Sequence, residues 1–62
     1  MTVNTINGKI TANKKTLNLI SIAFLDAAKH YTDEGADALA ERFDRVSDEI
    51  YHALNDIGYY NL

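Results

Sequence analysis

Residues 16–31 read TLNLISIAFLDAAKHY and predict a helix with more apolar surface than the remainder of this short chain can cover. One face has apolar residues at spacings of three and four, the pattern of a buried helix face: Leu17, Ile20, Phe24, Ala27 and Tyr31. Leu19, Ile22 and Leu25 lie outside that face, where the helical repeat also places polar residues. We therefore expect this second apolar stripe to contact another surface.

The chain has 62 residues, which is enough for one small domain. A domain of this size buries only about 60% of its unfolded surface, so its core is marginal. It contains no Cys, which excludes disulfides and thiolate metal sites. Self-association is the remaining common way to stabilise such a domain.

No targeting or membrane segment is expected. Residues 1–15 lack the basic start and apolar core of a secretory signal. The longest apolar run covers residues 22–25, whereas a membrane span needs about 20 apolar residues. The sequence predicts a soluble, cytoplasmic protein.

Residues 1–12 predict an extended arm or a short β-hairpin. Asn-Gly is the strongest signal for a two-residue hairpin turn, and it occurs here at Asn7-Gly8. Such a turn would pair Ile6 with Lys9, Thr5 with Ile10 and Val3 with Ala12. Because a lone hairpin is marginal in water, a frayed arm is the alternative.

Two helices are expected to follow, over residues 13–34 and 36–57. Asn13 is the favoured N-cap of the first, with Thr11 as the alternative. Gly35 and Gly58 are expected to end the helices in the left-handed conformation, which leaves residues 58–62 as a tail. The second helix has its own apolar face: Leu39, Phe43, Val46, Ile50, Ala53 and Ile57.

The expected fold is mainly α, a single domain in which the arm or hairpin precedes an antiparallel two-helix hairpin. We expect two copies to form a homodimer with a four-helix core. The interface would contain Leu19, Ile22, Leu25 and the half-exposed Tyr51. The alternatives are that the N-terminal strands cover the stripe, or that a different protein does.

Catalysis is not expected. Each of the two His residues follows an Asp by four positions, as Asp26–His30 and Asp48–His52. Such pairs can orient an imidazole, but they are common on solvated helix faces. No other catalytic, metal-binding or cofactor motif is present in the sequence, so we predict a non-enzymatic protein without cofactor or metal.

A row of acids, Asp37, Glu41, Asp44 and Asp48, lies on one face of the second helix. It spans about 16 Å at 1.5 Å per residue. One interpretation is an ordinary solvated face, partly neutralised by Arg45, which lies four residues from Glu41 and from Glu49. The other is mimicry of nucleic-acid phosphates. The net charge of −3 itself argues against direct nucleic-acid binding.

The function predicted from these features is that of a small protein–protein interaction or regulatory module that acts through a helical surface. The alternative follows from the acidic row. By analogy with small acidic phage proteins, the chain would be an inhibitor from a phage or mobile element, of the anti-restriction or anti-CRISPR type. It would block a nucleic-acid-binding enzyme of the host.

Overall fold

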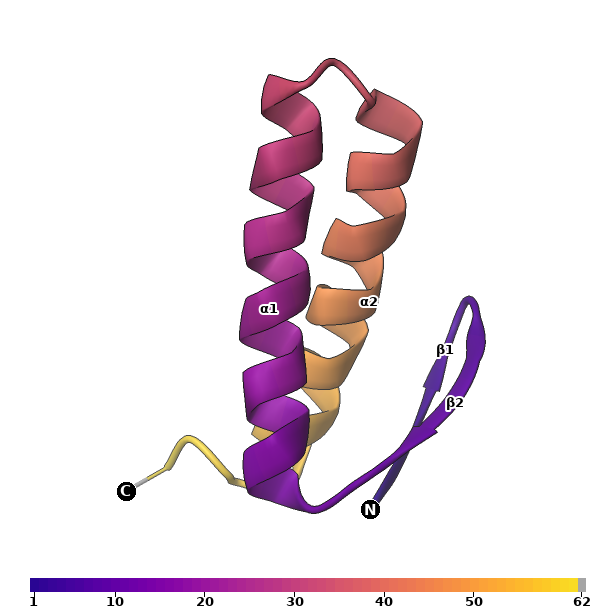
Figure 1. The fold of residues 1–62 in the computed structure, drawn as a ribbon. Coiled ribbons are helices and arrows are strands. Elements are labelled where there is room, and N and C mark those ends of the chain that lie inside the picture. Colours follow the sequence, from indigo (N-terminus) through magenta and orange to yellow (C-terminus); the bar gives the residue numbers. More distant parts are fainter. Residues whose placement is uncertain (62) are drawn as a thin grey trace.

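The computed structural model describes residues 1–61 and contains two strands followed by two helices (Figure 1). The strands are β1 (Thr2–Thr5) and β2 (Gly8–Thr11), and the helices are α1 (Lys14–Asp33) and α2 (Asp37–Asp56). The helices lie antiparallel and side by side, and the strands form a two-stranded antiparallel hairpin. The expected mainly helical fold is confirmed, with a real hairpin in place of a frayed arm. Neither helix of the described chain is long and apolar enough to cross a membrane.

The ends of α1 follow the capping signals in the sequence. The Asn13 side chain accepts a hydrogen bond of 2.8 Å from the Thr16 N–H, so Asn13 is the N-cap and Thr11 belongs to β2. At the other end Gly35 has φ 81°, and the Ala36 N–H donates to the Tyr31 carbonyl at 2.8 Å. This pattern is a Schellman motif, which satisfies carbonyls that the helix end leaves free.

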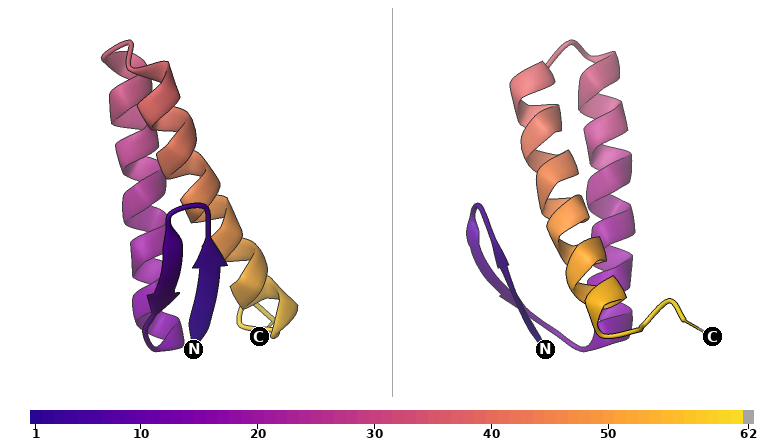
Figure 2. Two further views of the ribbon diagram at one scale, coloured as in Figure 1. Left: turned by 90° about the vertical axis from the view of Figure 1, so that its right-hand side faces the viewer. Right: turned by 180° about the vertical axis from the view of Figure 1, so that it is seen from behind.

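The end of α2 repeats the motif. Gly58 has φ 79°, and the Tyr59 N–H donates to the Leu54 carbonyl at 3.0 Å. Tyr59 packs against the core cluster that contains Leu54, as the hydrophobic contact of such a cap requires. The cap directs the chain after α2 across the first turn of α1 (Figures 1 and 2).

The expected register of the hairpin is wrong by two residues. Val3 pairs with Ile10 and Thr5 with Gly8, so Ile6 and Asn7 form the turn. Within residues 1–61 no residue other than glycine has positive φ, so Asn7 does not, and this rules out a type I′ turn at Asn7-Gly8. Of these two residues only Gly8 has positive φ, at 122°. The Thr5 hydroxyl accepts from the Asn7 N–H at 3.2 Å and donates to the Gly8 carbonyl at 3.1 Å, which stabilises the earlier turn.

The two-residue shift keeps every side chain on its original face of the hairpin. Val3 therefore still points inward, only 4% exposed, into a core cluster completed by Leu17, Val46, Ile50 and Leu54. β1 packs against α2, and the Ile6 N–H at the turn donates to the Glu49 carboxylate at 3.1 Å. The hairpin thus covers part of one face of the helix pair, at the end away from the turn between the helices (Figure 2).

The buried face of α2 is rotated from the one expected. Leu39 and Ile57 are 40% and 49% exposed, whereas Ala40 and Ser47 are buried. The expected face placed Ala40 and Ser47 only at its border, whereas both are buried in the structure. Small side chains occupy the line of closest approach because they allow two helix backbones to come near each other.

Candidate interaction groove

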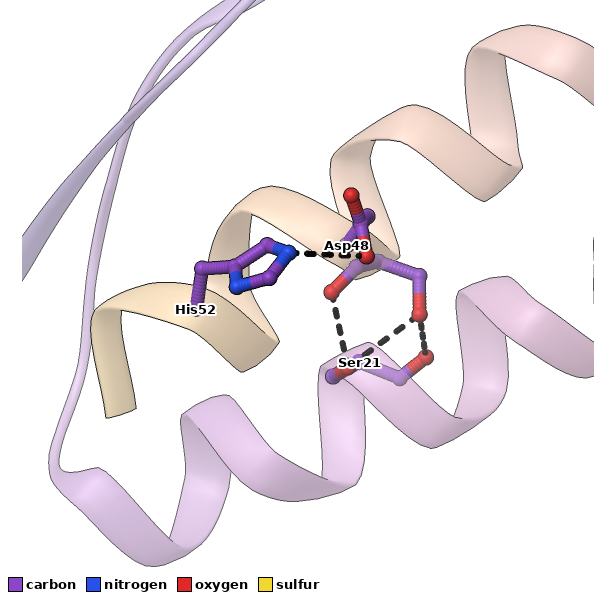
Figure 3. Close-up of polar contacts among 4 residues, drawn as sticks. Ser21, Asp48 and His52 are labelled. Carbon is purple, nitrogen blue, oxygen red and sulfur yellow. Dashed lines mark hydrogen bonds and ion pairs between the residues drawn. The ribbon is translucent and has the colours of Figure 1, made fainter. Parts of the chain in front are cut away.

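Two buried serines join α1 to α2. The Ser21 hydroxyl donates to the Ser47 carbonyl at 3.0 Å, and the Ser47 hydroxyl donates to the Ser21 carbonyl at 2.7 Å (Figure 3). Their hydroxyl oxygens are 3.1 Å apart. Each side chain thus reaches the backbone of the opposite helix, which requires the two helices to approach closely.

This close approach forms the floor of a groove between the helices. The floor consists of four buried small residues, two from each helix and seven positions apart in each: Ser21, Ala28, Ala40 and Ser47. Two hollows, of about 550 and 420 Å³, lie along it and share Leu25 and Asp44 as lining residues. No hairpin residue lines either hollow, because the hairpin covers the other face of the helices. We call this feature the groove.

Apolar side chains stand on both walls of the groove. Ile22 and Leu25 line it from α1 and are 50% and 40% exposed, and Tyr51 lines it from α2 at 46% exposed. The structure therefore brings together three of the four residues predicted for the interface. Leu19 lines neither hollow and is 59% exposed. The alternative that the N-terminal strands cover Leu19, Ile22 and Leu25 is wrong. The hairpin packs on α2 and leaves these three side chains exposed.

The tail closes one end of the groove. Tyr60 donates its hydroxyl to the Asn18 side-chain oxygen at 2.5 Å, and its ring stacks on that of Tyr51 with centroids 5.0 Å apart. Burial is the main cause that raises the pKa of Tyr60 above its usual value of 10.0, and the neighbouring Tyr51 and Tyr59 contribute further. Sequence reasoning left this tail unassigned.

The acidic row lies along the α2 side of the groove. Asp37, Glu41 and Asp44 line one hollow, and Asp44 and Asp48 line the other. All four are exposed. The hollow nearest the turn between the helices is also lined by Asp33 and Lys29 of α1. The predicted interface and the predicted acidic face are therefore two sides of one surface.

The acids are not neutralised in the way that the sequence suggested. Among residues 1–61 the one ion pair joins His52 Nε2 to Asp48 at 3.3 Å, with both side chains about two-thirds exposed. No guanidinium nitrogen of Arg45 lies within 4 Å of a carboxylate oxygen of Glu41 or Glu49, and the Glu49 carboxylate instead accepts the Ile6 N–H. Asp37, Glu41 and Asp44 are exposed and form no ion pair with a Lys, Arg or His side chain of the described residues.

The histidines and serines are not arranged for nucleophilic chemistry. His52 contacts the exposed Asp48 and the ring of Tyr51, while the hydroxyls of Ser21 and Ser47 donate to backbone carbonyls. Asp26 and His30 form no ion pair. Over the described part of the chain, no three His, Cys, Asp or Glu side chains are grouped so as to hold a metal ion.

In comparisons with known proteins, no family model, no curated protein and no solved structure matches this chain.

Proposed function

We propose that the protein is a non-enzymatic interaction module that binds another polypeptide in the groove. The observation that carries the proposal is that Ile22, Leu25 and Tyr51, all 40% exposed or more, converge on one groove with a buried floor. Burying a fully exposed side chain of this kind contributes about 1.5–3 kcal/mol, and these three are about half-exposed, so a partner that covers each gains about half of that. Isolated exposed apolar residues are ordinary, but apolar residues gathered in a groove mark a binding surface.

The homodimer expected from the sequence is one form of this proposal. In that form the second polypeptide is another copy, and two helix pairs stack into a four-helix core. Light scattering after size exclusion distinguishes a dimer from the 6.9 kDa monomer.

Site-specific photo-crosslinking in the native cells tests the proposal. A photoreactive amino acid is placed at position 22 or 25 in the groove, with position 4 on the outer face of the hairpin as control. We expect a discrete adduct at positions 22 and 25, to another protein or to a second copy, and none at position 4. No adduct at the groove positions, or equal adducts at all three, would contradict the proposal.

Phosphate mimicry is the second candidate, and the observation that favours it is the exposed, unpaired state of Asp37, Glu41 and Asp44. A mimic presents its charges to a basic cleft, so its activity depends on the acids and not on the apolar wall. Asp44→Lys together with Asp48→Lys would then abolish inhibition while Leu25→Ala leaves it unchanged. A loss of function in Leu25→Ala would reject mimicry as the main role.

A further inference from the structure

We infer that the natural occupant of the groove is a basic amphipathic helix of a partner protein, an inference that rests on the proposed function. Three features of the groove carry it: the asymmetric charge of its walls, the lack of free hydrogen-bonding groups on its floor, and its length. Each of them restricts the chemistry of the occupant.

The charge of the groove favours a cationic occupant. Asp33, Asp37, Glu41 and Asp44 line one hollow against a single cation, Lys29. Asp44 and Asp48 continue the row along the other hollow. Lys and Arg side chains that reach these carboxylates would form charge-assisted hydrogen bonds. A second copy stacked face to face would instead bring two acidic grooves together, and like charges across an interface are unfavourable.

The floor favours a helix over an extended segment. An extended peptide exposes backbone N–H and C=O groups that need partners when they are buried. The floor offers only methyl groups and the hydroxyls of Ser21 and Ser47, and both hydroxyls already have partners. A helix satisfies its own backbone, and small residues let it sink between α1 and α2 as the third helix of a bundle.

The length of the groove sets the length of the occupant. Its α1 wall extends from Asn18 to Asp33, which corresponds to about 22 Å. A helix of about 15 residues covers that distance. Such a helix would place apolar side chains at i, i+4, i+7 and i+11 against Ile22, Leu25 and Tyr51, with Lys and Arg along the flank that faces the acidic row.

A designed probe tests the inference. The probe is a fluorescein-labelled peptide of about 18 residues that has this pattern of Leu, Lys and Arg. A peptide of the same composition in scrambled order is the control. We expect saturable binding of the patterned peptide by fluorescence anisotropy, and binding of the scrambled peptide at least about tenfold weaker.

Matched variants of the protein locate the binding. Leu25→Ala should weaken binding about tenfold, whereas Leu39→Ala on the hairpin side, with the same 40% exposure, should change it by less than about twofold. Asp44→Asn with Asp48→Asn should weaken it about three- to tenfold and reduce its salt dependence. Asp26→Asn with Asp56→Asn changes the net charge by the same amount as that pair of substitutions, but at positions outside the groove. It should have little effect on peptide binding.

Three results would overturn the inference, and they separate its failure from that of the proposed function. Equal binding of patterned and scrambled peptides, or equal loss in the groove variants and their controls, would show non-specific attraction to an acidic protein. A dimer mass that Leu25→Asp converts to a monomer would show that a second copy fills the groove, which retains the proposed function and rejects the basic helix. Absence of both peptide binding and crosslinked adducts would reject the two together.

Discussion

Ser47 shows how a single small side chain determines the spacing of the two helices and, with it, the depth of the groove. It is 6% exposed and donates to the Ser21 carbonyl across the interface. A hydroxyl of this size satisfies its own hydrogen bond without separating the backbones. A larger side chain would have to displace α1.

Substitutions at Ser47 test this role. Ser47→Ala removes one buried hydrogen bond and should lower the free energy of unfolding by about 1 kcal/mol. Ser47→Leu overpacks the floor and should cost about 1–3 kcal/mol. Asn55→Leu, at an exposed position of the same helix, is the control and should have little effect. Urea unfolding followed by circular dichroism measures all three, and a stable Ser47→Leu variant would contradict the account.

Tyr60 makes the free energy of unfolding depend on pH in the alkaline range. Burial raises the pKa of Tyr60 in the folded state above 10.0, whereas the unfolded chain has the ordinary value. The folded state therefore holds this proton more tightly. The stabilisation is fully present below about pH 10 and is lost as the pH rises through the folded pKa.

The free energy of unfolding, measured between about pH 8 and 11, should therefore fall above pH 10 in the wild type. Tyr60→Phe should reduce that fall and should cost about 1 kcal/mol at neutral pH, because the bond to Asn18 is lost. If the variant declines as steeply as the wild type, Tyr60 is not the responsible group.

At the scale of the elements, the hairpin turn depends on Gly8 and not on Asn7. Gly8 has φ 122° with open space where a Cβ would be, so Gly8→Ala meets only backbone strain, of about 1–2 kcal/mol. Asn7 has negative φ, so Asn7→Ala should cost less than about 0.5 kcal/mol. Hydrogen exchange of the Ile10 amide reports the local opening. If Gly8→Ala and Asn7→Ala reduce the exchange protection of this amide equally, the turn depends on both residues, as a turn at Asn7-Gly8 would.

The helices were predictable from the sequence because local signals agree at their ends. Asn13, Gly35 and Gly58 act as their residue types suggest. Each observed helix is shorter than the expected one by one residue at either end, because the expected ranges included the cap residues. The hairpin register was not predictable in this way, because the Thr5 hydroxyl and the contact with Glu49 stabilise a turn one residue earlier.

The groove was only partly predictable. Ile22, Leu25 and Tyr51 were identified as surplus apolar surface, and the acidic row was identified by its spacing. What the sequence analysis missed was the floor, although the spacing of seven between Ser21 and Ala28, and again between Ala40 and Ser47, was a usable signal. The position of the hairpin depends on tertiary packing of Val3, which no local pattern indicates.

At the scale of the whole molecule, the chain is a thin plate of about 36 × 25 × 16 Å with two different faces. The hairpin lies on one face of the helix pair (Figure 2), and the residues that line the two hollows, none of them from the hairpin, form the groove on the other. Because the acidic groove disfavours a second copy, we expect a 6.9 kDa mass by light scattering at micromolar concentration. A dimer mass insensitive to Leu25→Asp would place self-association elsewhere on the surface.

We expect the groove face, and not the hairpin face, to bind the partner. The most direct test is a titration of the ¹⁵N-labelled protein with the patterned basic peptide, followed by the chemical shifts of every backbone amide. The account predicts saturable shifts along α1 from Asn18 to Asp33 and along α2 from Asp37 to Tyr51, with the amides of β1 and β2 unchanged. Shifts centred on β1 and β2, or no saturable shifts at any amide, would contradict it.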